Sequence, residues 1–597
     1  MKKYNSRSEV PEQYKWDLTP FFKDLDEYEK CFNETTKKVE ELKSYVGCTK
    51  DANKLYEFLT KDINTVASVE NLYVYAYLIN DQELGVSSSI ERKNKAEGLM
   101  NSYFMNISFF SPELLKLSKE EYDKLFEDNK SLNEFKSNLD DTYRMKEHIL
   151  PEDKQNIVTE LNNAMNHFED MSSTMLNSCH NYGVVHQNGE EIVLSPTNYR
   201  KVMKSSERVD RKAIREQYNK VLNQYGDMSA HFLDSFVKAC AAETKIKNYR
   251  SSWDSKLFDL KLTNKVFESL VNATEENLDV LQKYYELYKK VYHYPKLYQY
   301  DLVLDLVRDN KEYTIEEAQD IIKEALKPLG EDYLKLFNKV FENRYIDYCQ
   351  YKGKCSGGYS FSTLDNDSRI LLSFNGDLDS VSTIAHEGGH NVHHQMISLN
   401  NPLQYREKPS IICEVASLTN ECLLSSYLSE HGKTPEEKLA GIDNILGVIV
   451  SNLFGAVREG KMEQDMYSYV EQNGTLTKDY LDKLTLDCLS KYYGDKVELD
   501  ECSNTSWMTR SHFYMFFYLY SYAICISVAS YVAKEILDGN KDMLDKYMKF
   551  LSTGSDVDTM DTFKVLGIDL EDKKVYEDAI KYFDSLIDKF NKIYEEA

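Results

Sequence analysis

Two histidines four residues apart flank a glutamate in the run His386-Glu387-Gly388-Gly389-His390. On a helix, residues four apart lie one turn apart on the same face, so both imidazoles can reach one metal ion. Glu387 projects beside that face, where its carboxylate can accept a proton from a water that zinc activates. The spacing therefore predicts one zinc ion per chain that promotes hydrolysis, with Glu387 as the general base.

A catalytic zinc ion needs a third protein ligand and an open position for water. One common extension of the motif would place glycine at position 393 and histidine at position 396. The chain has His393 and Met396 at these positions, so that extension is absent. The third ligand is therefore expected to be a carboxylate from a later helix.

Of the glutamates that follow the motif, Glu414 is the best candidate. It lies in the apolar run 411–418, where an unpaired carboxylate would be costly to bury and where zinc would be its partner. Glu407 falls in a predicted loop and Glu430 at a predicted helix end. Glu421, on the same helix face as Glu414, is expected either to orient a ligand histidine or to be a solvated acid near the helix end.

His393 and His394 extend the metal-binding face of the predicted helix by one more turn. Because three ligands are already supplied, both are expected to support the site or to lie at the surface. The helix that carries the motif is predicted to begin near Asp379 or Ser380, since both are good N-caps. A strand over residues 370–374 precedes it.

Elsewhere the pattern is helical, with apolar residues at three- and four-residue spacing. A β-hairpin is predicted over residues 184–187 and 190–194, joined by the turn dipeptide Asn188-Gly189. We expect a mainly α protein with a small β element beside the metal. We divide it into an N-terminal helical region, 1–195, that ends in the hairpin, and a catalytic region, 196–597.

Composition excludes some partners and favours a compartment. The formal net charge of −26 disfavours nucleic acid and an anionic membrane surface. Eleven scattered cysteines without a CxxC pair, and an N-terminus without an apolar stretch, indicate a cytoplasmic protein. Residues 513–533 carry no charge but include five tyrosines and three serines, which predicts a buried helix of a soluble protein and not a membrane span.

Four segments together resemble the oligoendopeptidase F family, whose members are related to the thimet-type oligopeptidases. One is the strand over residues 370–374 with Asn375-Gly376, which resembles the segment before the zinc helix of that family. Residues 384–393 are similar to the zinc helix of that family, and Glu414 to Ser417, with Glu421, are similar to its third-ligand helix. His512-Phe513-Tyr514 and the following residues resemble its catalytic segment rich in His and Tyr. The resemblance is strongest over residues 352–533.

The resemblance implies a two-lobed helical zinc peptidase with a deep channel, which hydrolyses internal bonds of short unstructured peptides. It also implies that His512, Tyr514, Tyr518 and Tyr520 are the candidates to stabilise the oxyanion that forms when water attacks the peptide carbonyl. The strand near Leu371 is expected to pair with the substrate backbone by edge addition.

Three further residues, Gly358, Tyr359 and Gly388, bear on the predicted site. Gly358 and Tyr359, in the loop before the strand, are candidates for contact with the substrate or the ligands. Gly388 departs from the larger residue usual in the family, and two adjacent glycines weaken a helix interior by up to about 2 kcal/mol. The oligomeric state is not predicted.

Two other functions remain as alternatives. A metallocarboxypeptidase of related helical fold would need a basic residue for the terminal carboxylate of its substrate, and Arg510 could supply it. A catalytically silent peptide-binding protein would have no use for Glu387. The products of digestion distinguish the first alternative, and zinc content together with turnover distinguishes the second.

Overall fold

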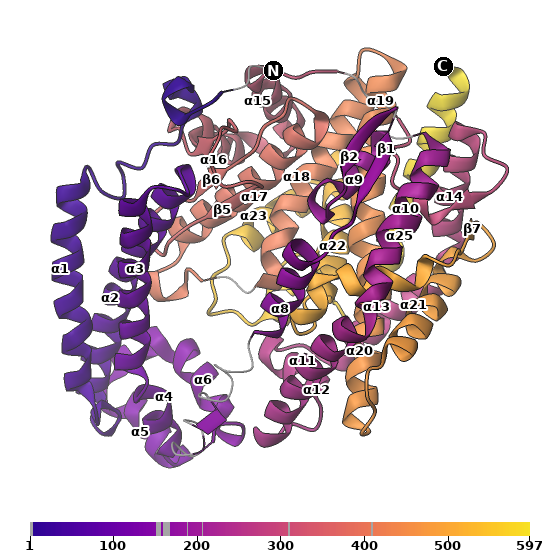
Figure 1. Cartoon of the computed structure of the whole chain (residues 1–597). Coiled ribbons are helices and arrows are strands. Elements are labelled where there is room, and N and C mark those ends of the chain that lie inside the picture. The colour runs from indigo at the N-terminus through magenta and orange to yellow at the C-terminus, as the bar shows by residue number, and fades with distance from the viewer. Residues whose placement is uncertain are drawn as a thin grey trace. The chain divides into compact units, whose positions relative to one another are not determined.

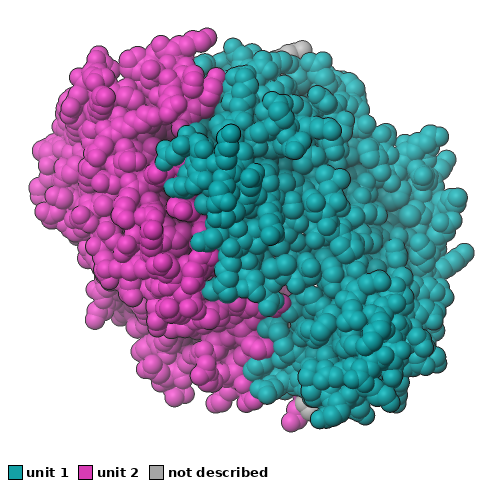
Figure 2. Space-filling view, turned by 180° about the vertical axis from the view of Figure 1, so that it is seen from behind, with its two compact units in different colours: residues 1–152, 310–424, 535–567 teal, residues 153–309, 425–534, 568–597 magenta. Residues whose placement is uncertain are grey.

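The computed structural model describes residues 4–150, 154, 157–158, 167–187, 189–205, 207–307, 311–407 and 410–597. The described chain is predominantly helical with a few short strands, which confirms the predicted mainly α class (Figure 1). It divides into two compact units, each assembled from three segments (Figure 2). Unit 1 comprises 1–152, 310–424 and 535–567, and unit 2 comprises 153–309, 425–534 and 568–597. Unit 2 draws on both sides of residue 195, and the division into 1–195 and 196–597 stays a prediction.

The helices of unit 1 are α1 (Leu25–Leu42), α2 (Ala52–Gln82), α3 (Ser87–Ile107), α4 (Phe110–Lys116), α5 (Lys119–Asp128), α6 (Lys136–Arg144), α15 (Ile315–Ala325), α16 (Gly330–Glu342), α17 (Leu378–Asn400), α18 (Ser410–His431, which continues into unit 2), α23 (Lys541–Leu551) and α24 (Thr559–Val565). Figure 1 shows α1, α2 and α3 side by side. In α2, Leu55, Phe58 and Leu72 are fully buried at helical spacing, and the Asp51 side chain caps the first turn.

The helices of unit 2 are α8 (Phe168–Thr174), α9 (Pro196–Ser205), α10 (Arg208–Gln224), α11 (Gly226–Ile246), α12 (Ser252–Leu260), α13 (Asn264–Glu276), α14 (Leu278–Tyr292), α19 (Pro435–Ile449), α20 (Ala456–Glu471), α21 (Lys478–Tyr493), α22 (Leu519–Leu537, which ends in unit 1) and α25 (Lys574–Glu596). β1 (Val184–Gln187) and β2 (Glu190–Val193) form the predicted antiparallel hairpin. Asn188 of its turn lies outside the described residues. A parallel pair joins β3 (Leu297–Tyr298) to β7 (Val497–Glu498).

A three-stranded sheet in unit 1 precedes α17, the helix that is predicted to bind the metal. Its order is β4 (Ile346–Asp347), β6 (Arg369–Leu371) and β5 (Tyr359–Phe361), with β6 in the centre. The observed strand β6 spans residues 369–371 and is shorter than the predicted strand over residues 370–374. The expectation that the strand near Leu371 pairs with the substrate backbone is wrong, because β6 is already paired on both sides. The buried Lys354 ammonium donates to the carbonyls of Asp347, Cys349 and Leu372, which ties the two parallel strands together.

The uncharged stretch 513–533 is not one continuous helix. Residues 511–514 form a short 3₁₀ turn, and α22 begins only at Leu519. Within the described residues, one helical run is long and apolar enough to cross a membrane, Pro435–Glu471, and 56% of its most apolar window is buried in the protein. Such burial is typical of a core helix.

Candidate active site

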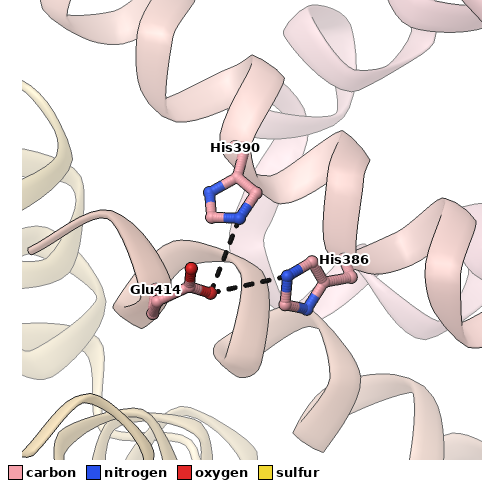
Figure 3. Close-up of side chains that lie close together, drawn as sticks. All are labelled: His386, His390 and Glu414. Atoms are coloured by element: carbon pink, nitrogen blue, oxygen red, sulfur yellow. Dashed lines mark ion pairs between the residues drawn. The ribbon is translucent and has the colours of Figure 1, made fainter. Parts of the chain in front are cut away.

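The predicted metal-binding motif lies in the middle of α17, whose first turn is capped by Asp377. The Asp377 carboxylate accepts the Ser380 N–H at 2.9 Å, so the cap lies two residues before the predicted Asp379 and three before Ser380. Because the helix is regular through the motif, His386 and His390 point from the same face (Figure 3). α18 crosses beside this face and contributes Glu414.

The three predicted ligands converge on one point. Glu414 Oε2 lies 3.4 Å from His386 Nε2 and 3.6 Å from His390 Nε2, and all three side chains are a quarter exposed or less (Figure 3). Two donors bonded at about 2.1 Å to one ion in tetrahedral geometry are about 3.4 Å apart. Two imidazole nitrogens and one carboxylate oxygen, all within 4.8 Å of one another, could therefore hold one metal ion.

Glu421 fixes the orientation of His386. Its Oε1 lies 2.6 Å from His386 Nδ1, and its Oε2 accepts the Ser382 hydroxyl at 3.1 Å. This bond directs Nε2 of the same ring toward Glu414. Burial alone lowers the pKa of His386, but the hydrogen bond and charge of Glu421 outweigh it and raise that pKa to about 9. The geometry fits the ligand-orienting alternative for Glu421, which is only 8% exposed, and not the solvated one.

Glu387 is 8% exposed and lies next to the ligand face. Burial raises the pKa of its carboxyl to about 7, with His386 opposing the shift and the charges of Glu414 and Glu421 adding to it. A carboxyl group that titrates near neutrality can both accept and return a proton at physiological pH. These are the properties that a general base needs.

Close contact between α17 and α18 explains Gly389. A Cβ built at this position would lie 2.8 Å from Ala416 O and from the Cα of Ser417, and neither backbone atom can yield. The glycine allows the helices to approach closely enough for Glu414 to reach both histidines. Asn420 strengthens the contact by donating to Ala385 O at 3.0 Å and accepting the Tyr333 hydroxyl at 2.8 Å.

The unusual Gly388 also has a physical reason. A Cβ at this position would lie 2.5 Å from the ring of Phe337, a fully buried residue of α16. The phenyl ring fills the space that a larger residue would occupy. Glycine at position 388 therefore allows α17 to pack against α16, and it is not a source of local flexibility at the predicted ligands.

We predict that Gly388→Ala lowers the free energy of unfolding by about 1–3 kcal/mol, because an overpacked core must shift. Adding Phe337→Leu to this variant should restore most of the loss. The control is Gly98→Ala in α3, where nothing lies within 4 Å of the added methyl, and it should stabilise by up to about 1 kcal/mol. Denaturant unfolding measures all three. An unchanged stability of Gly388→Ala alone would contradict this packing account.

The neighbouring histidines of α17 take supporting positions. His393 is 1% exposed and its ring stacks on Phe550 of α23 at 6.4 Å. His394 Nε2 lies 3.1 Å from Asn366 O, in the turn between β5 and β6. Neither belongs to the described group of converging ligand atoms, which fits their predicted supporting role.

β5 lies beside the ligand helix. Gly358, just before it, is exposed, and a Cβ there would lie 3.1 Å from Thr383 of α17. The Tyr359 hydroxyl donates to Asp81 of α2 at 2.8 Å, so this side chain anchors the strand. A cavity of about 490 Å³ within unit 1 is lined by Phe361, Leu364, His390 and Arg406, among others. Open space therefore adjoins His390, one of the predicted ligands, and the β5 edge.

The predicted His and Tyr segment lies in unit 2. Burial and the Arg510 charge lower the pKa of His512, which favours its neutral imidazole. Tyr514 packs on Phe236 with 5.2 Å between ring centroids, and burial raises its pKa to about 12. Tyr518 directly precedes α22 and is partly exposed.

Tyr520 requires a correction. It is 5% exposed, and its ring packs on Phe267 at 4.2 Å and on Trp253 at 5.4 Å, while Gly460 leaves room for it. This is a core aromatic of unit 2 and not an oxyanion donor.

Tyr522 is a candidate oxyanion donor that the sequence analysis does not include. It is partly exposed and contacts both His512, at 6.0 Å, and Tyr518, at 5.2 Å. Its spacing of four from Tyr518 was the available signal.

Arg510 is engaged within its own unit. Its Nε lies 2.5 Å from Glu459 Oε2, and Glu459 also pairs with Arg458 at 3.0 Å. An arginine committed to this ion pair is poorly suited to bind the terminal carboxylate of a substrate. The carboxypeptidase alternative therefore loses the residue on which it depended.

Comparison with known proteins adds independent findings. A model described as Peptidase family M3 matches residues 201–582, and one described as Oligopeptidase F matches 113–179. The chain is 27% identical to oligopeptidase PepF of Bacillus subtilis, over 98% of this chain and 88% of that protein. It is 27% identical to the group B oligopeptidase PepB of Streptococcus agalactiae, over 97% of each. The structure of oligoendopeptidase-F from Enterococcus faecium has the same fold, with a TM-score of 0.74 at 24% identity over 96% of this chain and 99% of its own.

Proposed function

Because the chain belongs to peptidase family M3 and is a metal-dependent oligopeptidase that cleaves internal bonds of short peptides, we propose that one zinc ion is held by His386, His390 and Glu414 and that Glu387 is the general base. The observation that carries this proposal is the convergence of the three side chains, with Glu414 Oε2 at 3.4 and 3.6 Å from the two imidazole nitrogens. Two histidines and a glutamate form a common ligand set of catalytic zinc. A bound zinc ion would polarise the scissile carbonyl and lower the pKa of a water in the fourth position.

The residues around the ligands have distinct tasks in this proposal. Glu387 accepts a proton from the attacking water and later passes it to the leaving amine. Burial raises the pKa of its carboxyl group, which helps this group to hold the proton between the two steps. Glu421 holds His386 through Nδ1, which supports a fixed direction for Nε2.

His512 and the tyrosines near it supply hydrogen bonds to the oxyanion. The resemblance of this segment to the family's catalytic segment supports the assignment, as do the mutual ring contacts of His512, Tyr518 and Tyr522. Tyr514 remains a candidate, and Tyr520 is left out because it is buried in the core.

The substrate is proposed to bind as an extended strand along β5. This strand is at the edge of its sheet, opposite β4, and it borders the cavity next to His390. Backbone pairing of this kind recognises peptides with little regard to sequence, while the cavity takes one side chain. Recognition would then require a free, unfolded backbone.

We further propose that the protein works in the cytoplasm, without nucleic acid or membrane partners. None of the eleven cysteines, which all belong to the described residues, forms a disulfide bond, and this suits a reducing compartment. The net charge of −26 opposes binding to other polyanions.

Size selection tests the proposed substrate class. Peptides up to about twenty residues, roughly 70 Å when extended, should be cleaved rapidly. Casein, which has no fold to protect its bonds, should be cleaved poorly at the same residue pairs. Initial rates by mass spectrometry make the comparison. Degradation of casein at the rate of short peptides would contradict an enclosed site, including the deep channel that stays a prediction.

A further inference from the structure

A strained turn connects the His and Tyr parts of the proposed oxyanion segment. Phe516 has a φ of 44° and Phe517 a φ of 57°, both in the left-handed region that bulky L residues rarely adopt. Within the described parts of the chain, no other two consecutive non-glycine residues have positive φ. Such strain persists only where the surroundings enforce it, and it is frequent at active sites.

Three neighbours enforce this turn, all from unit 2. The Phe517 ring is 1% exposed and packs 4.6 Å from Tyr467 and 5.1 Å from Trp253. From α20, the carboxyl group of Glu463 accepts the Phe517 N–H at 2.7 Å. Glu463 is fully buried, and its bond is the polar contact that fixes the backbone of the turn.

The turn lies between His512 and α22. The His512 ring lies 6.0 Å from the ring of Tyr522, ten residues later, and Tyr522 contacts Tyr518 at 5.2 Å. We propose that Glu463 is a positioning residue, which holds the Phe516–Phe517 turn and thereby sets His512 against Tyr522 for oxyanion stabilisation. This inference rests on the proposed role of the segment.

Stability alone does not account for a carboxyl group at this position. Burial raises the pKa of Glu463 to about 8, against the opposing effects of the Phe517 N–H and Lys256. Its Oε2 makes no hydrogen bond to the described residues. Burying a carboxyl group with one partner is unfavourable, and residues that break such a rule are concentrated at functional sites.

The test compares Glu463→Met, which removes the acceptor at similar volume, with Glu463→Gln, whose amide oxygen can accept the same N–H. For a short internally quenched peptide, kcat per metal-loaded enzyme should fall at least tenfold in Glu463→Met, with KM and metal content unchanged. Glu463→Gln should retain most of kcat. A smaller loss in the Met variant, or an equal loss in both variants, would overturn the proposal.

Asp443→Leu is the matched control, because Asp443 of α19 also uses its carboxylate to accept a backbone N–H, that of Val307 at 3.1 Å. It should change the unfolding temperature but not kcat. If Glu463→Met does not fold, Phe516→Gly replaces it, since glycine frees the turn without touching Glu463. A tenfold lower kcat then supports the proposal, and an unchanged kcat overturns it.

A double-mutant cycle separates this inference from the proposed function. If His512→Ala does not lower kcat, the proposed role of His512 is wrong. If His512→Ala lowers kcat and Glu463→Met does not, only the positioning role is wrong. If Glu463 acts through His512, the two losses should be strongly non-additive, and additive losses would overturn the inference.

Discussion

Glu387→Gln is expected to lower the turnover of short peptides by about 10³- to 10⁴-fold while metal content stays that of the wild type. The amide is nearly isosteric but cannot accept the proton of the attacking water. Since Glu387 is not among the three converging ligands, its replacement should not release the ion. Peptide kinetics and elemental analysis of the same sample make the measurement.

Asp379→Asn is a suitable control for the Glu387 variant. It makes the same carboxylate-to-amide change on the same helix, at an exposed position in the first turn. Its turnover should equal that of the wild type. Substantial activity of a metal-replete Glu387→Gln enzyme would remove Glu387 from the role of base.

The second large effect concerns the ligands on α18. Glu414→Ala should abolish stoichiometric zinc binding, because two imidazoles one helical turn apart then hold the ion alone. Glu421→Ala leaves all three ligands in place and releases His386 Nδ1 together with the Ser382 hydroxyl, so zinc affinity should fall by about 10- to 100-fold. Competition with a chromophoric chelator measures both affinities.

Glu430→Ala controls for the loss of a carboxylate from the same helix. Glu430 is exposed near the end of α18 and pairs with Lys589, and its removal should leave zinc affinity unchanged. Normal zinc binding in Glu414→Ala together with loss of zinc in Glu421→Ala would reverse the roles assigned to these two residues.

Local spacing was enough to predict which side chains the structure brings together at the metal site. His386 and His390 are four residues apart and therefore lie on one face of one helix. The apolar residues around Glu414 indicate that its carboxylate needs a partner, because an unpaired carboxylate is costly to bury. The hairpin of unit 2 was likewise predicted from neighbouring residues, namely the turn dipeptide Asn188-Gly189. These features depend on neighbours in the chain, which a sequence displays directly.

Long-range packing was not predictable in this way. Leu371 was expected at a sheet edge, but its partner strand β4 lies more than twenty residues earlier and covers that edge. Tyr520 was expected at the site, but Trp253 and Phe267 bury it from helices more than 250 residues away. The reason for glycine at position 388 is the ring of Phe337, which comes from α16 and packs against it. In each case the deciding contact comes from a distant segment.

Digestion of a mixed set of short peptides, read by mass spectrometry, tests the central claim most directly. The wild-type enzyme should produce pairs of complementary fragments from internal cleavage, a chelator should abolish them, and one equivalent of zinc should restore them. Glu414→Ala at the same zinc concentration should produce none. Cleavage that survives the chelator, or that yields only single amino acids trimmed from peptide ends, would contradict a zinc endopeptidase built on His386, His390 and Glu414.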